Sequence, residues 1–299
     1  MKIAVLGATG RVGRLVTAAF LNDPPSELQI FKQCRKGGTD LGKNWFCWDL
    51  TSRSDGLEQL VSERDGIDCL INFAGVTPAS ESPDFTANAR LATACLSEAA
   101  RLGINQVFLA SSAAVYGRPK TNAPLLESAT LQPVSDYGIA KLAMENAAVP
   151  FQSKLSVTCM RIGNVAGADS VLLNRTPASS QNRQPLDCFE DGNTPLRSYI
   201  GARTLAQVLR SLCAASISGQ KIPPKLNVAS PAPIFMEQLL QAASAVGTKL
   251  GWRLVSAPPD ALPAVVMSTS VLESFHKFRA QDDLPSEMIH QWRACLGVA

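Results

Sequence analysis

The sequence predicts an α/β protein built on a doubly wound parallel sheet, with a small α/β subdomain toward the C-terminal end. Short apolar runs of the kind that form buried strands alternate with amphipathic helical patterns through the first half of the chain. Strands joined by helices in this way pair in parallel and place helices on both faces of the sheet. The first strand leads directly into a glycine-rich turn and a helix, as is typical of the start of such a fold.

Composition places the chain among globular enzymes and excludes several other classes. It has 299 residues, of which 46% are hydrophobic and 18% charged, enough for a large core. The net charge of +3 is too small to indicate a nucleic-acid or membrane partner. The 8 Cys form no CxxC pair and the 2 His lie far from any Cys cluster, so we expect reduced thiols, a cytoplasmic location and no metal site. The first apolar run is too short for a signal peptide, and no stretch could cross a bilayer.

The elements are expected in a simple order. In the first half, strands are expected at 3–6, 28–33, 45–49, 68–73 and 106–111, and helices at 14–21 and 84–102. In the second half, the pattern predicts helices from 136 toward 150 and at 204–215, 233–247, 271–279 and 285–295, and strands at 225–228 and 252–256. We therefore expect a dinucleotide-binding Rossmann domain over 1–163 and an interlocked substrate-binding region over 164–299, with the segment 200–230 returning to the first domain.

The turn after the first strand predicts a dinucleotide site. Gly7 allows a sharp turn, Gly10 allows close approach of a pyrophosphate, and Gly13 allows the helix to pack against the strand. The phosphates would then lie against free N–H groups at the positive end of the helix dipole. Thr9, Arg11 and Val12 complete this loop, and the alternative is an ordinary glycine-rich turn.

The segment after the second strand bears on the choice between NAD and NADP. NAD-type sites place an acidic residue there for the ribose 2′-hydroxyl, whereas this chain has Cys34, Arg35 and Lys36. Arg35, with Lys36 and Arg11, suits a 2′-phosphate, which favours NADP slightly over NAD. The alternative is that these are solvated loop cations. Asp49 and Leu50, after the third strand, are placed to hold an adenine.

The fourth strand ends in small residues that would let a cofactor approach. They are Phe73, Ala74 and Gly75, at the carboxyl end of the strand. Asn88 lies within the following helix, where a polar side chain facing the sheet needs a partner. A plain strand-to-loop turn is the alternative.

The fifth strand and the helix after it carry the chemistry. Ser112 ends the strand, while Tyr137 and Lys141 are four residues apart and share one helix face. A nearby ammonium and a cationic nicotinamide would favour the phenolate of Tyr137, making it a general acid/base at a hydroxyl or ketone. Ser112 could hydrogen-bond the same oxygen.

These motifs occur in one order: GATGRVG at 7–13, NFAG at 72–75, SSAAVYG at 111–117 and YGIAK at 137–141. With them the chain resembles the extended short-chain dehydrogenase/reductase family and, within it, the NAD-dependent epimerase/dehydratase group, which mostly acts on nucleotide sugars. The similarity continues through RIGNVAG, RSYI and LNV, over the first three-quarters of the chain. It implies that Ser112 and Tyr137 are catalytic, that Lys141 also holds the nicotinamide ribose, and that substrate contacts fall at Thr77, Ser111, Asn164 and Arg197.

Three departures limit what the resemblance implies. The acidic pair of the 4,6-dehydratases is replaced by Ala113 and Ala114, so elimination of water lacks its acid and base. The acidic residue that usually opens the helix after RSYI is absent from 201–204. The segment 168–190 is short, so a diphosphate would have to meet Arg175, Arg183 or Arg197, of which Arg197 is preferred.

Three functions follow. The first is epimerisation of a nucleotide sugar, with a cofactor that stays bound. The second is an NADP-dependent reductase or dehydrogenase of a non-nucleotide small-molecule ketone or alcohol, which Arg35 favours. The third is a non-catalytic cofactor-sensing protein, against which the intact Ser112, Tyr137 and Lys141 argue. By analogy with the family, a homodimer would form through the helices near 87–101 and 137–148.

Overall fold

A seven-stranded parallel sheet forms the centre of the protein. The computed structural model describes residues 1–22, 27–36, 42, 44–52, 54–78, 80, 83–121, 123–173 and 183–298. The strand order is β11-β6-β5-β4-β1-β2-β3, which confirms the predicted doubly wound parallel sheet. The strands are β1 (Lys2–Leu6), β2 (Gln29–Cys34), β3 (Trp45–Cys47), β4 (Cys69–Asn72), β5 (Gln106–Ser112), β6 (Ser156–Ile162) and β11 (Lys225–Val228).

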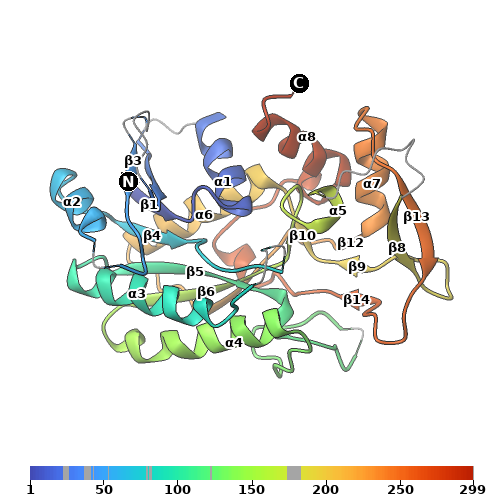
Figure 1. Cartoon of the computed structure of the whole chain (residues 1–299), viewed down its shortest axis with the longest axis horizontal. Helices are drawn as coiled ribbons and strands as arrows, with labels where there is room; N and C mark the ends of the chain where they lie inside the picture. Colours follow the sequence, from blue (N-terminus) through green and yellow to red (C-terminus); the bar gives the residue numbers. More distant parts are fainter. Residues whose placement is uncertain are drawn as a thin grey trace.

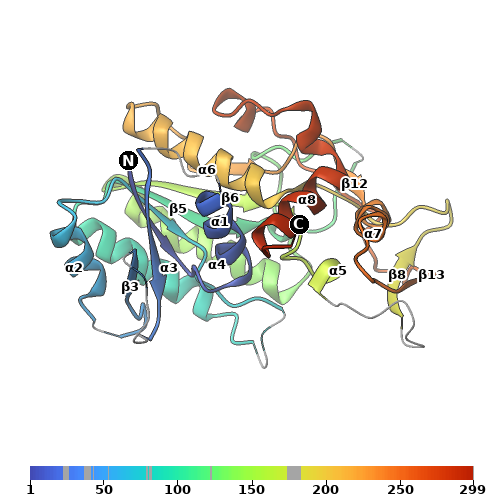
Figure 2. The ribbon, with the colours of Figure 1, turned by 90° about the horizontal axis from the view of Figure 1, so that it is seen from above.

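Helices cover both faces of this sheet (Figures 1 and 2). Three of them, α1 (Arg11–Asn22), α6 (Ala202–Ile217) and α8 (Pro285–Cys295), pack in one hydrophobic cluster with one face. The helices α2 (Gly56–Glu63) and α3 (Ala87–Arg101) and residues of α4 (Asp136–Ala148) pack against the other face. Burial of these two apolar layers removes water from both sides of every central strand, as a parallel sheet requires.

Strand register brings the ends of the strands to one edge. Leu6 is paired with Asn72, Asn72 with Leu109, and Ser112 with Ile162. Because parallel strands end at the same edge, the loops after β1, β4 and β5 lie side by side.

The second half of the chain adds small sheets at one end of the molecule. They pair β7 (Asn164–Val165) with β10 (Tyr199–Ile200), β9 (Leu196–Arg197) with β12 (Ile234–Phe235) and β14 (Ala264–Val265), and β8 (Gln184–Cys188) with β13 (Trp252–Ser256). The helices there are α5 (Ser170–Leu173) and α7 (Met236–Ala245). Figure 1 shows β8, β13 and α7 at the end opposite α2. Both α6 and β11 belong to the central sheet layers. The division into two domains, with the boundary at residue 163 and the return of 200–230, stays a prediction.

Several elements differ from expectation, among them β6, α5 and most strands of the small sheets, which were not predicted. Helix α2 was not predicted, and the segment 271–279 holds only the short turn Leu272–Ser274 instead of a helix. Hydroxyl groups compete with the helix there, since Thr269 Oγ1 donates to Glu273 and Ser274 Oγ donates to the Val271 carbonyl. The apolar residues of this segment recur at helical spacing because Leu272 is buried in the hydrophobic cluster and Phe275 and Phe278 pack against it, although the backbone forms no continuous helix.

The unusual start of α6 is explained by a residue from α8. Gln291 Oε1 accepts hydrogen bonds from the N–H groups of Arg203 and Thr204 at 3.0 and 3.1 Å. A Cβ on Gly201 would lie 2.2 Å from that oxygen, so glycine is needed for its approach. Gln291 thus satisfies N–H groups at the start of α6, which the chain does not open with an acidic residue.

Candidate active site

The turn after β1 forms a bare backbone cradle. Gly7 has a φ of +69°, and the Gly10 N–H donates to the Gly7 carbonyl at 2.9 Å. A Cβ at Gly13 would lie 2.2 Å from the Gly7 oxygen, so only glycine lets α1 start this close to the strand. Thr9 is exposed, and Arg11 and Val12 are partly exposed at the start of α1. Free N–H groups at a helix start, with no side chain in the way, fit a pyrophosphate.

Gln33 anchors this turn, a role that the sequence analysis missed. It is 2% exposed at the end of β2. Its Oε1 accepts from the Gly7 N–H at 2.9 Å, and its Nε2 donates to the Trp48 carbonyl at 2.5 Å. The available signal was a polar residue within an apolar strand.

Arg35, Asp49 and Leu50 lie together beyond β2 and β3, and we call them the adenosine end of the site. Arg35 is exposed, Asp49 is partly exposed and Leu50 is buried. Hydrogen bonds from Thr51 lower the pKa of Asp49, and the charge of Arg35 adds to this effect. The Arg35 side chain is thus close enough to Asp49 to act on it electrostatically. That the two residues flank one bound nucleoside stays a prediction.

The loop after β4 packs directly on the glycine turn. A Cβ on Gly7 would lie 2.5 Å from the Ala74 nitrogen, and the Phe73 N–H donates to the Leu6 carbonyl at 3.0 Å. A Cβ on Gly75 would lie 3.4 Å from Lys141 Nζ, so this loop also reaches the catalytic helix. The loop 73–75 therefore contacts both the glycine turn after β1 and the helix that carries Lys141.

Asn88 has a different role from the one expected. It is 1% exposed, and its amide bonds the backbone of Val76 in both directions, at 3.0 and 3.1 Å, and the Phe85 carbonyl at 3.2 Å. These bonds use the side chain to fix the loop after Gly75. Asn88 thus positions the cofactor loop, and a direct cofactor contact stays a prediction.

Ser112, Tyr137 and Lys141 lie close together in the structure, while their catalytic roles stay a prediction. Lys141 Nζ lies 5.7 Å from the centre of the Tyr137 ring and donates to the Ala110 carbonyl at 2.8 Å. Gly138, not singled out from the sequence, permits this arrangement. A Cβ there would lie 2.5 Å from the Ala114 oxygen, so glycine lets the start of α4 approach the turn after Ser112.

Burial controls protonation of this group. It raises the pKa of Tyr137, and the hydrogen bond with Ser112 only partly offsets this effect. Burial also lowers the pKa of Lys141 to about 8. The expected preference for the phenolate depends on a cationic nicotinamide as well as on Lys141, so it stays a prediction; in the chain alone, desolvation favours the neutral phenol.

Ser111 points away from the catalytic set, contrary to its expected substrate contact. Its hydroxyl is buried and donates to Glu145 Oε1 at 2.6 Å. Glu145 forms a two-point ion pair with Arg161, at 3.0 and 2.8 Å, with both side chains at most 1% exposed. Arg161 also donates to Tyr116 Oη at 3.1 Å. No local sequence pattern indicates this group, because its members come from β5, α4, β6 and the residue after the short turn Ala113–Val115.

The remaining predicted substrate residues lie in the loops and small sheets beyond the catalytic set. Asn164 is partly exposed in β7, and Thr77 is partly exposed in the loop after Gly75. Within the described residues, Arg197 donates only to the carbonyls of 196, 262 and 263, and burial lowers its pKa. Arg183 is exposed, and Arg175 lies outside the described residues.

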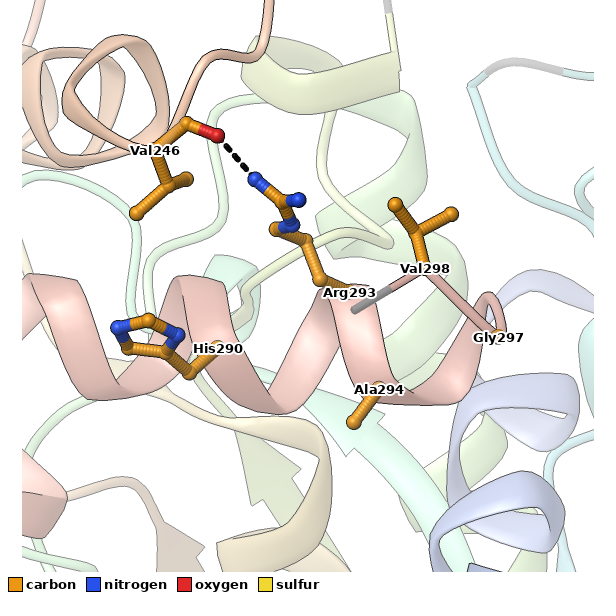
Figure 3. Close-up of a pocket in the computed structure, with 6 residues that line it drawn as sticks. All are labelled: Val246, His290, Arg293, Ala294, Gly297 and Val298. Atoms are coloured by element: carbon orange, nitrogen blue, oxygen red, sulfur yellow. Dashed lines mark hydrogen bonds between the residues drawn. The ribbon is translucent and has the colours of Figure 1, made fainter.

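A hollow of about 560 Å³ lies elsewhere, between α8 and the end of α7 (Figure 3). Figure 3 shows the Arg293 guanidinium directed at the Val246 carbonyl, to which it donates, with His290 farther along α8. Within the part of the chain that the structure describes, no cluster of ligating side chains could hold a metal ion, and no helix is long and apolar enough to cross a membrane.

Comparison with known sequences agrees with this geometry. The sequence pattern of the NAD dependent epimerase/dehydratase family matches residues 3–223. A UDP-glucose 4-epimerase from Streptomyces lividans is 28% identical over 231 residues, which cover 69% of each chain. A dTDP-6-deoxy-L-talose 4-dehydrogenase (NAD(P)(+)) from Kitasatospora kifunensis is 28% identical over 258 residues, 80% of this chain and 78% of the relative.

Solved structures share the fold over the whole length. A UDP-glucose 4-epimerase from Stenotrophomonas maltophila, with bound NAD and formylated UDP-arabinopyranose, superposes with a TM-score of 0.76 at 18% identity and covers 100% of both chains. One from Bifidobacterium longum, in complex with NAD+ and UDP, has a TM-score of 0.73 at 17% identity and covers 98% of each. With the family pattern matched across the glycine turn and the Ser112, Tyr137 and Lys141 set, this chain belongs to the NAD dependent epimerase/dehydratase family and is an enzyme of the extended short-chain dehydrogenase/reductase type.

Proposed function

We propose that the enzyme oxidises or epimerises a hydroxyl-bearing carbon of a nucleotide sugar. The observation that carries the proposal is the convergence of Ser112, Tyr137 and Lys141 beside the loop 73–75. The similar UDP-glucose 4-epimerases and dTDP-6-deoxy-L-talose 4-dehydrogenase, as named, support a nucleotide-sugar substrate. We take 164–299 as the substrate-binding region on the same grounds.

A nicotinamide dinucleotide, when bound, supplies the hydride acceptor and donor for this chemistry. The chain's residues supply the proton transfer and the charge. Tyr137 Oη takes the proton of the substrate hydroxyl and returns it to the ketone oxygen, while the Ser112 hydroxyl holds that oxygen. Lys141 keeps a positive charge beside the Tyr137 ring below its pKa of about 8. This charge offsets the cost of forming a buried phenolate.

Two replacements restrict the reaction type. Ala113 and Ala114 follow Ser112 in the short turn Ala113–Val115, and neither carries a group that could donate or accept a proton. An elimination of water needs an acid and a base there. Transfer of hydride with retention of the hydroxyl needs only Tyr137, so epimerisation or simple oxidation is favoured over dehydration.

Arg197 is the residue that we assign to the substrate diphosphate. Among the described residues its guanidinium has hydrogen bonds only to carbonyl oxygens, so its charge is not neutralised by a carboxylate in a hydrogen bond. A partly buried cation in this state gains from binding an anion of matching shape.

Arg35 supports a second candidate, an NADP-dependent reductase or dehydrogenase. It lies at the adenosine end, directly after β2, in the segment 34–37 that contains no acidic residue, and its charge suits a 2′-phosphate. Such an enzyme would exchange its cofactor at every turnover.

One experiment separates the two candidates. The purified enzyme is denatured, and any released nucleotide is identified by mass. Stoichiometric NAD would support the epimerase and contradict the assignment of Arg35 to a 2′-phosphate. An empty protein that binds added NADPH would support the reductase or dehydrogenase, and substrates would then be sought among ketones.

A further inference from the structure

Two cysteines lie opposite each other at the adenosine end. Cys34 ends β2 and Cys47 ends β3, and the two residues are paired in register. Neighbouring strands are about 4.8 Å apart, which falls within the Cα separation of about 4.4–6.8 Å that a disulfide needs. The spacing therefore permits a bond between the two sulfurs without separating the strands.

The two side chains also lie on one face of the sheet. Residues paired in register point to the same side, and the neighbouring pair shows this directly: Lys32 Nζ lies 4.7 Å from the centre of the Trp45 ring. Cys34 Sγ donates to the carbonyl of Phe46, the residue next to Cys47, at 3.6 Å. Burial raises the pKa of Cys34, and the nearby thiol of Cys47 adds to this effect.

The pair combines an accessible thiol with a protected one. All eight cysteines lie in the described residues, and Cys47 is the exposed one, whereas Cys34 is 6% exposed. An exposed thiol that meets an oxidant first, with a second thiol beside it, is the arrangement found in redox-responsive pairs.

The two cysteines are directly connected to the backbone of Arg35, one by a hydrogen bond and the other as its neighbour in the sequence. Cys47 Sγ donates to the Arg35 carbonyl at 3.4 Å, while Cys34 is the residue immediately before Arg35. A bond between the sulfurs removes the Cys47 hydrogen and with it this hydrogen bond. Arg35 is assigned to the cofactor. A change in the two cysteines therefore changes a hydrogen bond of the backbone that carries the Arg35 side chain.

We propose that Cys34 and Cys47 form an oxidisable dithiol that closes to a disulfide with hydrogen peroxide and thereby weakens cofactor binding at Arg35. The Cys47 sulfur attacks one peroxide oxygen, the O–O bond breaks, and one water leaves with formation of a sulfenic acid. The Cys34 sulfur then attacks the Cys47 sulfur, the S–O bond breaks, and the Cys34 proton leaves with the hydroxyl as a second water. Two thiols are oxidised by two electrons, and peroxide is reduced to two waters. The effect on the cofactor depends on the proposed function, whereas the disulfide itself does not.

The disulfide is tested by mass. The purified full-length enzyme is treated with hydrogen peroxide, remaining thiols are alkylated, and tryptic peptides are compared before and after reduction; Arg35 and Lys36 let trypsin separate the two cysteines. We expect a linked peptide pair in the unmodified chain and in the control Cys188→Ser, and its loss in Cys34→Ser and Cys47→Ser. Oxidation of Cys47 to a sulfinic acid with Cys34 still alkylated, or no oxidation of either residue, would overturn the proposal.

The consequence is tested by NADPH titration of the same samples. We expect peroxide to weaken NADPH binding several-fold in the unmodified chain, dithiothreitol to restore it, and Cys47→Ser to show no response to peroxide. Unchanged affinity in a sample whose disulfide is proven by mass would refute the coupling to Arg35. A reduced enzyme that binds neither NADPH nor NADH would contradict the proposed function instead, while the mass test would still decide the disulfide.

Discussion

Removal of Glu145 tests whether the buried ion pair under the catalytic residues supports the fold. Glu145 lies one helical turn after Lys141 on α4, and its carboxylate accepts two hydrogen bonds from Arg161 and one from Ser111. Burial opposes the charge of Arg161, but the pair with Glu145 keeps its pKa above the usual value. In Glu145→Ala the guanidinium would stay buried without its carboxylate.

The expected cost follows from this geometry. Breaking a fully buried pair on one side costs about 3–5 kcal/mol, because the remaining charge is uncompensated. Replacing both partners, as in Glu145→Met with Arg161→Met, removes both charges and should cost less than the single change. The control is Glu98→Ala on α3, since its pair with Arg101 is 21% and 49% exposed and should contribute at most about 1 kcal/mol.

Urea unfolding of the four proteins measures these free energies. The account predicts that Glu145→Ala is much less stable than Glu98→Ala, and that the double variant recovers part of the loss. The reasoning is refuted if Glu145→Ala costs no more than the control, or if the double variant is no more stable than Glu145→Ala.

Three more predictions concern the adenosine-end residue Arg35, the anchor Gln33 of the glycine turn, and Asp169, a residue between β7 and α5 with a buried carboxylate oxygen. Arg35→Ala should weaken NADPH binding more than NADH binding in fluorescence titrations, and equal losses would refute the 2′-phosphate assignment. Gln33→Leu leaves the Gly7 N–H and the Trp48 carbonyl unpaired, so it should lower unfolding stability by about 1–3 kcal/mol and weaken cofactor binding, whereas the exposed control Gln29→Leu should do neither. Burial raises the pKa of Asp169 to about 6, so its ionisation destabilises the folded state as the pH rises from the unfolded pKa through about 6. Asp169→Asn should therefore raise the melting temperature by more at pH 8 than at pH 4. An equal change at the two pH values would contradict this.

Local relations in the sequence predicted most of the fold and the centre of the site. Gly7, Gly10 and Gly13 follow a strand directly, and Tyr137 and Lys141 share a helix face through their spacing. The carboxyl ends of parallel strands meet at one edge, so Ser112 could be placed without knowing its neighbours.

Long-range partners were not predictable in the same way. Gln291 caps Arg203 from 88 residues away, and Arg161 pairs with Glu145 across β6 and α4. The sequence around each of these residues does not show which distant side chain will contact it in the folded chain. The family resemblance assigned Ser111 to the substrate. Successive residues of a strand point to opposite faces, however, and the Ser111 hydroxyl points to Glu145.

The central claim, that Tyr137 transfers the proton during hydride transfer at a sugar carbon, is tested by rapid mixing. The enzyme is mixed with NAD+ or NADP+ and a UDP-hexose, and the absorbance of the reduced nicotinamide is followed, with cofactor affinity measured separately. The account predicts that Tyr137→Phe binds the cofactor with nearly unchanged affinity and forms reduced nicotinamide at least about 100-fold more slowly. A Tyr137→Phe rate within a few-fold of the unmodified enzyme would contradict it.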